Sequence, residues 1–315
     1  MDQQMWLDLL EGMGYIVVAF VAIYFSGWLI YDKIATRGYS LSKALFEDRN
    51  LAAGFEIATF LLLELLISIS ALSGDSVTRM AENGEMVVHY SRDLEAVALT
   101  IVCSNLLFFF LRYVGSLWIA WFFRGKLDSH GDVVEFNNEI FAQHNFGASL
   151  FSTSFMIAIY HMIFQADFLG TRDYQTEGLI NLAVVFLTAV LVYFLHNLFF
   201  MTRKHHIMDE LFIDNNAGAG LSLVGFMFAM LHLQSKISLH FVQEEHFLNS
   251  ETSTYVYLLL IFVFLIGFRR FFIFLFDWFT TKRFNQEFLE HDNPVAGLLD
   301  MTFVISTGLM LAVII

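Results

Sequence analysis

The 315-residue chain has little proline, cysteine or charge: one proline, one cysteine and 15% charged residues. The single cysteine, Cys103, excludes a disulfide or a cysteine-ligated metal site within one chain. Soluble domains carry about 25% charged residues, so the low charge argues against a fold surrounded by water. The chain is instead rich in apolar residues, with 57% hydrophobic residues and 37 phenylalanines. This composition predicts a protein with several membrane-spanning helices.

Eight apolar segments are long enough to cross a bilayer, for which a helix needs roughly 20 residues. The expected segments are Met13–Tyr31, Leu51–Leu72, Ala96–Phe123, Phe146–Phe164, Leu179–Met201, Ala217–Ile237, Tyr255–Phe276 and Pro294–Ile315. Arg112 interrupts the third segment and His232 the sixth. The alternating pattern of a membrane β-barrel is missing. We therefore expect an all-α polytopic membrane protein with eight transmembrane helices.

Lysine and arginine are distributed unevenly between the two sides of these segments. Twelve lie in or beside the connections after the first, third, fifth and seventh segments, and only four lie on the opposite side. Because positive residues accumulate in cytoplasmic loops, we expect both termini on the periplasmic side. The net charge of −14 argues against nucleic acid as a partner.

One short pattern occurs four times, as "FEDRNLAAGFEI", "FAQHNFGASLFS", "FIDNNAGAGLSL" and "LEHDNPVAGLLD". Each copy has an amphipathic stretch, then an asparagine, then small residues that open an apolar segment. The asparagines are Asn50, Asn145, Asn216 and Asn293, and the small residues four positions later are Gly54, Ser149, Gly220 and Gly297. Asparagine is a preferred N-cap residue, and small residues allow close helix packing in membranes. The pattern predicts four helical hairpins, each with a short amphipathic segment on the cytoplasmic side and a capped second helix.

A longer repeat is present above the hairpins. Arg112 precedes Trp121 by nine residues, and Arg269 precedes Trp278 by nine residues. We therefore expect two four-span units, residues 1–166 and 167–315. The first contains hairpins at about 13–72 and 96–166, and the second contains hairpins at about 179–237 and 255–315. Hairpins that all run the same way predict parallel repeats about an axis along the membrane normal.

The stretch "MDELFIDNNAGAGLSLVGFMFAM", and more loosely "FNQEFLEHDNPVAGLLDMTFVISTG", resembles the bacterial membrane family called domain of unknown function 350 (DUF350). The resemblance touches all four hairpins and is weakest in the second, where Ser149 replaces the last glycine. It implies an integral inner-membrane protein without an agreed activity, whose genes neighbour envelope-stress, membrane-remodelling or polyamine genes. It implies no catalytic residues.

Ionisable residues inside apolar segments are the candidates for function. They are Arg112, Arg269, Arg270, Glu56, Glu64, His161, His232 and Asp300. His161 and His232 each follow their asparagine by sixteen residues and thus occupy equivalent positions. Two interpretations stay open: a polar axis that conducts ions or protons, or pairs of Arg112 or Arg269 with Glu56, Glu64 or Asp300 that hold the bundle together.

The sequence has no motif of an enzyme or a cofactor site, so we expect no catalytic activity and no cofactor. An outer loop with His240, Glu244, Glu245 and His246 could hold a divalent cation, but a solvated acidic face is the favoured interpretation and no metal site is predicted. We favour a membrane platform that recruits cytoplasmic partner proteins. The sequence leaves open whether the protein forms a homo-oligomer. The alternative is a channel or transporter for protons, polyamines or other small cations.

Overall fold

The computed structural model describes residues 13–14, 16–17, 20–21, 23–25, 27–36, 38–72, 78–80, 86–88, 90–128, 130–166, 175–202, 204–243 and 250–314. Seven long helices are α2 (Leu51–Leu72), α3 (Tyr90–Phe122), α5 (Phe146–Ala166), α6 (Gln175–Phe200), α8 (Ala217–Gln243), α9 (Ser250–Phe279) and α10 (Pro294–Ile314). The described residues between 13 and 30 are helical as well. Each expected apolar segment therefore coincides with a helix, and the starts of α2, α5, α8 and α10 coincide with the expected ones.

Five helices of the described part are long and apolar enough to cross a membrane. The five spans are Val102–Phe122, Ala183–Phe200, Ala217–Ile237, Leu259–Phe279 and Pro294–Ile314, and Phe146–Met162 forms a shorter apolar helix. Large apolar side chains such as Phe25, Val263 and Phe110 are more than half exposed on the outside of the bundle. An exposed apolar belt of this size suits contact with lipid. The chain is thus a multi-pass membrane protein.

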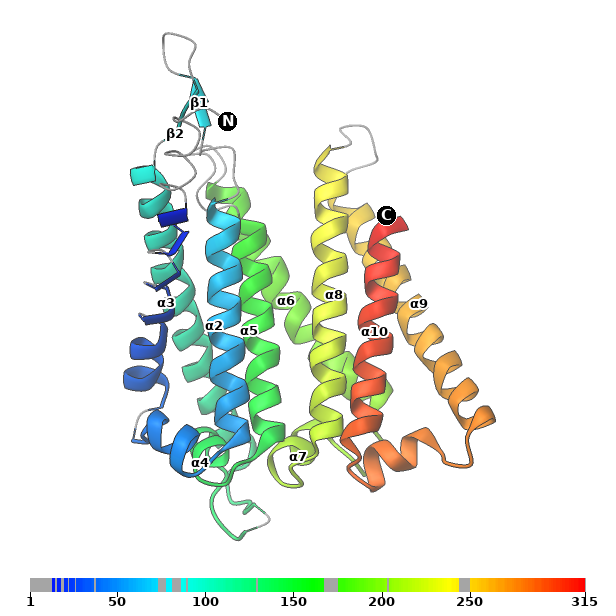
Figure 1. Ribbon diagram of the computed structural model, residues 1–315. Helices are drawn as coiled ribbons and strands as arrows, with labels where there is room; N and C mark the ends of the chain where they lie inside the picture. The colour runs from blue at the N-terminus through cyan, green and yellow to red at the C-terminus, as the bar shows by residue number, and fades with distance from the viewer. Residues whose placement is uncertain are drawn as a thin grey trace.

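Short helical segments lie at one end of the bundle, next to the starts of α2, α5, α8 and α10 (Figure 1). They are the π-helical η1 (Tyr31–Ala35), η2 (Lys43–Glu47) and η5 (Gln286–Glu290), and the α-helices α4 (Phe136–Phe141) and α7 (Ile207–Phe212). We call η2, α4, α7, η5 and the loops beside them the cap layer. The C-terminal end of α10 lies at the opposite end of the bundle (Figure 1).

The bundle has an inner row of helices. In Figure 1, α2, α5, α8 and α10 stand side by side in this order, and each contacts the next. The outer helices α3, α6 and α9 pack against this row. We number four units along the row, each made of one cap-layer segment, its asparagine and the inner helix that follows: unit 1 (43–72), unit 2 (136–166), unit 3 (207–243) and unit 4 (286–314).

A small β-hairpin departs from the all-α expectation. Strands β1 (Thr78–Met80) and β2 (Met86–Val88) pair antiparallel, with Arg79 opposite Val87. The hairpin lies in the connection between α2 and α3, at the end of the molecule away from the cap layer (Figure 1). β-Branched residues such as Val87 and Val88 favour strands, and two strands of three residues are too short to leave a clear pattern in the sequence.

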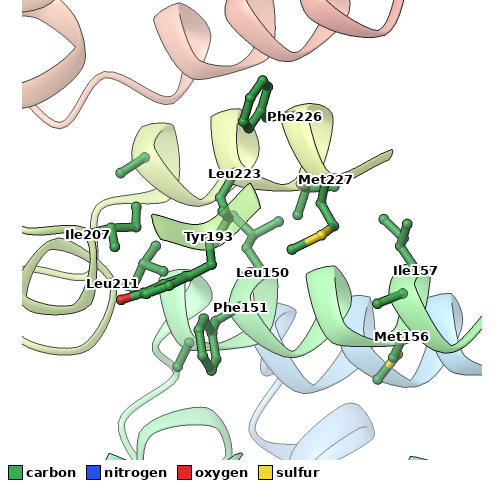
Figure 2. Close-up of a cluster of buried hydrophobic side chains, with 14 of the residues drawn as sticks. Leu150, Phe151, Met156, Ile157, Tyr193, Ile207, Leu211, Leu223, Phe226 and Met227 are labelled. Carbon is green, nitrogen blue, oxygen red and sulfur yellow. The ribbon is translucent and has the colours of Figure 1, made fainter. Parts of the chain in front are cut away.

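The core is continuous from the inner row into the cap layer. Figure 2 shows Leu150 and Phe151 of α5 facing Leu223 and Met227 of α8, with Leu211 of α7 beside them. The apolar side of α7 is fully buried, since Ile207, Met208, Leu211 and Phe212 are 0% exposed. The segment α7 therefore fills the end of the core, and its apolar face is not available to other molecules.

Candidate functional site

The four asparagines cap the inner helices as the sequence predicted. Each side-chain oxygen Oδ1 accepts a hydrogen bond from a main-chain N–H in the first turn of its helix. The N···O distances are 3.0 Å for Asn50 and Ala53, 2.9 Å for Asn145 and Ala148, 2.9 Å for Asn216 and Ala219, and 3.0 Å for Asn293 and Val295. Such a bond satisfies a donor that would otherwise be unpaired at the helix start.

The side-chain nitrogen Nδ2 of the first three asparagines links one unit to the next, a contact that the sequence did not indicate. Nδ2 of Asn50 donates to the main-chain oxygen of Ile140 at 2.7 Å. Nδ2 of Asn145 donates to Phe212 O at 3.4 Å, and Nδ2 of Asn216 donates to Phe288 O at 3.2 Å. Each of these bonds runs from one unit to the cap-layer segment of the following unit. The amide thus acts as a helix cap and as a clamp between units.

A glutamate supports three of the four asparagines, and two of these glutamates, Glu139 and Glu210, are buried. Glu139, Glu210 and Glu287 stand six residues before their asparagines, and their Oε2 atoms accept from Nδ2 at 2.9, 2.7 and 3.1 Å. Unit 1 has Ala44 at this position. The sequence analysis missed these glutamates, although their constant spacing from the asparagine in three copies was a usable signal.

The environment shifts the pKa values of these carboxyl groups in different directions. Burial raises the pKa of Glu139 to about 7, opposed by the hydrogen bond from Asn145 and assisted by Asp128 and Asp132. Burial also raises the pKa of Glu210, against the hydrogen bonds from Asn216 and His205. In unit 4, the hydrogen bonds from Asn293 and Lys282 lower the pKa of Glu287. The supporting carboxyl is therefore closest to neutral in unit 2.

Replacing Glu139 with glutamine is expected to stabilise the protein at pH 8 by about 1–2 kcal/mol, because it removes a buried negative charge. Water at the cap layer screens part of the pKa shift, so the gain in stability is smaller than the full shift implies. The folded-state pKa lies above the unfolded value, so the wild-type stability falls as pH rises from about 4.5 to about 7 and is then constant. Thermal unfolding in detergent at pH 5 and pH 8 measures the stability of wild type and of Glu139→Gln. Glu135→Gln, an exposed neighbour, is the control. An equal effect of Glu139→Gln at both pH values would contradict the prediction.

The small residues four positions after each asparagine lie at contacts between inner helices, with one exception. Ser149 Oγ donates to Ala52 O at 2.8 Å, which joins α5 to α2. A Cβ added to Gly297 would meet the backbone of Gly218, and one added to Gly220 would meet Leu150. Gly54, in unit 1, has only the tip of its own unit's Leu45 nearby. The predicted packing role therefore holds for three of the four positions.

Arg112 and Glu56 form a buried ion pair between α3 and α2. Ser152 of α5 donates to Glu56 Oε1 at 2.5 Å and lies 3.1 Å from Nη1 of Arg112. Nη2 of the arginine donates to Asn137 Oδ1 at 2.8 Å, and its guanidinium carbon lies 4.6 Å from the centre of the Phe136 ring. The arginine thus ties together two inner helices, one outer helix and the cap layer.

Arg269 and Asp300 form the corresponding pair between α9 and α10. Nε and Nη2 of the arginine donate to the two carboxylate oxygens at 2.7 and 3.1 Å, a bidentate geometry. Ser222 of α8 donates to Asp300 Oδ2 at 2.5 Å, and His196 Nε2 lies 3.0 Å from the serine oxygen. The guanidinium carbon is 3.9 Å from the centre of the Phe200 ring.

The two clusters have the same composition with the acid and the serine exchanged. In the first, the acid Glu56 is six residues after the asparagine of unit 1, and Ser152 is seven after that of unit 2. In the second, Ser222 is six after the asparagine of unit 3, and Asp300 is seven after that of unit 4. The junction of units 1 and 2 and the junction of units 3 and 4 therefore each hold one arginine, one carboxylate and one hydroxyl. This exchange keeps the charge balanced inside the bundle, as mid-membrane charges require.

Glu64 lies in a separate polar group and does not pair with an arginine. Its Oε1 accepts from Ser104 Oγ at 2.7 Å and from Asn105 Nδ2 at 3.2 Å, both on α3. Phe60 and Phe108, with ring centres 4.8 Å apart, lie between the levels of Glu56 and Glu64. The predicted polar groups are thus split into two levels of the bundle.

His161 and His232 meet, as their equivalent positions suggested. Their ring centres are 6.2 Å apart, between α5 and α8, and the Phe228 ring stacks on His232 at 5.8 Å. Within the described part of the chain, neither ring nitrogen of His161 has a hydrogen-bond partner. The pair is therefore held by packing and not by a polar chain to Glu64 or the arginines.

Arg270, the remaining intramembrane candidate, lies in the span Leu259–Phe279 but does not join a buried polar cluster. Its side chain is exposed and its Nη2 donates to the main-chain oxygen of Phe199, in the last turn of α6, at 3.0 Å. One residue of helix rotation turns it away from the buried face that Arg269 occupies. Conversely, His196, Ser152 and Ser222 are buried polar partners that the sequence analysis missed, because single small polar residues are common in apolar helices.

The described side chains leave only small spaces near the polar groups. One cavity of about 10 Å³ borders Arg112 and Ser152, and another of about 10 Å³ borders Glu64 and Ser104. Each has room for about one water, and Phe108 and Ile159 line both. A larger space of about 240 Å³ between α3, α5, α6 and α8 is lined almost wholly by apolar side chains.

The proposed outer-loop cation ligands, His240, Glu244, Glu245 and His246, lie outside the residues whose side chains the structure describes. Among those that it does describe, no group of three or more histidine, cysteine, aspartate or glutamate side chains could hold a metal ion.

Comparison with known proteins gives one match. No curated protein and no solved structure matches the chain. Residues 173–315 match the family described as Domain of Unknown Function (DUF350). The matched region contains units 3 and 4 together with α6 and α9, and so includes the Arg269–Asp300 cluster and two of the four capping asparagines. This part of the chain is similar to the DUF350 family.

Proposed function

We propose that the chain is an eight-span inner-membrane platform whose cap layer faces the cytoplasm and recruits partner proteins, with both termini in the periplasm. The lysines and arginines that set the expected orientation lie at the cap-layer end of the helices, among them Lys43, Arg124 and Lys126. A link to envelope stress rests on the family resemblance alone. The proposal gives the protein no catalytic role.

A row of exposed side chains on a rigid base carries this proposal. The residue before each asparagine has a left-handed backbone and an exposed side chain: Arg49 (φ 52°), His144 (φ 56°), Asn215 (φ 54°) and Asp292 (φ 48°). The asparagine clamps join the segments that present them. Four different side chains at equivalent positions, held by buried contacts, form a surface that a partner protein can recognise.

Replacing Arg49, His144 and Asp292 with glycine, and keeping Asn215 because its Oδ1 accepts from the main-chain N–H of Gly147, is expected to abolish partner recruitment without harming the fold. Glycine adopts positive φ without strain, so the substitutions remove side chains and relieve roughly 1 kcal/mol at non-glycine positions. Affinity capture from native membranes, compared between wild type and this variant, measures recruitment. Thermal unfolding checks that the variant is at least as stable as wild type. Partners that bind a stable glycine variant as well as wild type would refute the platform.

The alternative function, a proton or small-cation conduit, is favoured by the two water-sized cavities that Phe108 and Ile159 separate. Such an apolar constriction could gate a path between Arg112 and Glu64. The side chains that line both cavities, Phe108 and Ile159, are apolar, so we rank this function second. Proton flux is measured in vesicles that contain wild type or the Glu64→Leu/His232→Leu variant. A flux through wild type that the variant loses would favour the conduit over the platform.

A further inference from the structure

The contact between successive units has the same direction at all three internal junctions. The asparagine amide of unit 1 donates to unit 2, that of unit 2 to unit 3, and that of unit 3 to unit 4. One side of each unit thus always contacts the opposite side of the next. This is a heterologous contact, which continues from copy to copy unless it closes into a ring.

The small residues follow the same direction at two of the three junctions. There, the residue four positions after the asparagine of one unit packs on the residue two positions after the asparagine of the preceding unit, whereas Gly220 of unit 3 faces Leu150 of unit 2. Ser149 contacts Ala52 between units 1 and 2, and Gly297 contacts Gly218 between units 3 and 4. In Figure 1 the row is open, with α2 at one end and α10 at the other. Unit 1 therefore lacks a preceding neighbour, and unit 4 lacks a following one.

The open side of unit 1 exposes a residue that is buried in every other unit. Phe46 stands four positions before its asparagine and is 73% exposed. Its counterparts Phe141, Phe212 and Leu289 are 4%, 0% and 5% exposed. Phe212, for example, packs on Phe123, Phe136 and Phe151, which lie in or next to the preceding unit. Phe46 has the same shape and position but no unit to pack against.

On the open side of unit 4, Nδ2 of Asn293 has, among the described residues, no main-chain carbonyl of a following unit to which it can donate. Asn50, Asn145 and Asn216 are 2%, 3% and 0% exposed, whereas Asn293 is partly exposed. Within the described part of the chain, Nδ2 of Asn293 donates only to Glu287 of its own unit. A carbonyl in the position of Ile140 or Phe212, here Leu45 or Phe46 of another copy, would complete the pattern.

The two open sides also match in size and charge. Val295 is larger than its counterparts Ala52, Gly147 and Gly218, but the residue it would meet is Gly54, where an added Cβ would contact only the tip of Leu45, at 3.5 Å. At the junction of units 3 and 4, Asp292 lies near Asp214 and raises its pKa, after the larger effect of burial. At a junction between copies, Arg49 would take the place of Asp292, and the place of Asp214 would be taken by His291, which stands between the acids Glu290 and Asp292 of unit 4. Opposite charges there favour the contact.

We propose that the chains associate head to tail in the membrane, with the α10 side of one copy docked on the α2 side of the next. Asn293 of the first copy donates to the Leu45–Phe46 carbonyls of the second, and Phe46 of the second packs on unit 4 of the first. The occupant of both open sides is thus a second copy of this chain. The contact is the internal junction repeated once more.

Cysteine cross-linking tests the register of this contact in a Cys103→Ala background. Gly54→Cys is carried by one tagged chain and Val295→Cys by a second, differently tagged chain, and a mild oxidant is added in native membranes. A disulfide between the two tags is expected only when both chains are present. An Ala52→Cys/Ser149→Cys chain, which copies the register within one molecule, is the positive control. Val295→Cys chains linked to each other, or no link while the control forms its own, would overturn the proposal.

The exposed Phe46 provides a second test that does not disturb the fold. Phe46→Ser in lipid nanodiscs is expected to lower the dimer fraction at least tenfold in native mass spectrometry, with unchanged thermal stability. Trp121→Ser, at a residue 72% exposed on α3, is the matched control and should leave the dimer fraction unchanged. A monomeric wild type, or equal dimer fractions for wild type and Phe46→Ser, would refute the proposal.

Discussion

Replacing Asp300 with leucine is expected to lower the free energy of unfolding by about 3–5 kcal/mol, because it leaves the Arg269 guanidinium buried without its counter-charge. Arg269 is 2% exposed and Asp300 is 0% exposed. The bidentate pair is the only ionic partner that the described part of the chain provides for this arginine. Ser222 and His196 are neutral neighbours and cannot replace the lost charge.

A double variant separates the cost of an unpaired charge from the cost of lost packing. Arg269→Met/Asp300→Leu removes both charges and is expected to recover most of the stability lost by Asp300→Leu, since a buried ion pair is often nearly neutral against an apolar replacement. Reversible unfolding in mixed micelles measures the three proteins side by side. If the double variant is less stable than Asp300→Leu, the arginine has stabilising contacts beyond the carboxylate, and the interpretation of this cluster as a charge-balanced lock fails.

Replacing Gly297 with alanine is expected to destabilise the protein by about 3 kcal/mol, at the upper end of the range for overpacking. The added methyl group would collide with the backbone of Gly218, which cannot move aside as a side chain could. The helices α8 and α10 would have to separate, and Gly218 itself meets the Asn293 carbonyl at the same crossing. The effect therefore spreads to the helix start.

Gly267→Ala is the matched control for this substitution. Gly267 also lies within a long helix, but a Cβ added there meets nothing within 4 Å. Alanine favours the helix, so a gain of about 0.5–1 kcal/mol is expected. Thermal unfolding of the two variants in the same detergent compares them. Equal effects of the two alanines would show that the α8–α10 contact is looser than its geometry indicates.

The sequence predicted best what depends on neighbouring residues. Helix positions follow from apolar length, and α2 occupies the expected Leu51–Leu72. The asparagine caps follow from a side chain that reaches the N–H groups two or three residues ahead. The pairing of Arg112 with Glu56 and of Arg269 with Asp300 was included among the expected pairs, because a mid-membrane charge needs an opposite charge and few were present.

Residues far apart in the chain were beyond such reasoning. Asn216 Nδ2 reaches Phe288, and Ser152 joins Glu56, over separations that no local pattern encodes. Glu64 could have paired with an arginine by its depth alone, yet it binds Ser104 and Asn105 because α3 presents these residues to it. Arg270 lies one position from Arg269 but on the opposite side of α9, and only the packing of the helix shows which of the two is buried.

By itself, the sequence determined that this is an apolar helical protein with four capped helix starts, since composition and capping are local properties of the chain. The tertiary structure decided how these parts meet. It joined the units through the Nδ2 atoms of Asn50, Asn145 and Asn216. It also exchanged acid and serine between the two arginine clusters, and left Phe46 and Asn293 at the open ends of the row. These features depend on the order in which helices pack, and that order is set by close contacts between small residues on different helices.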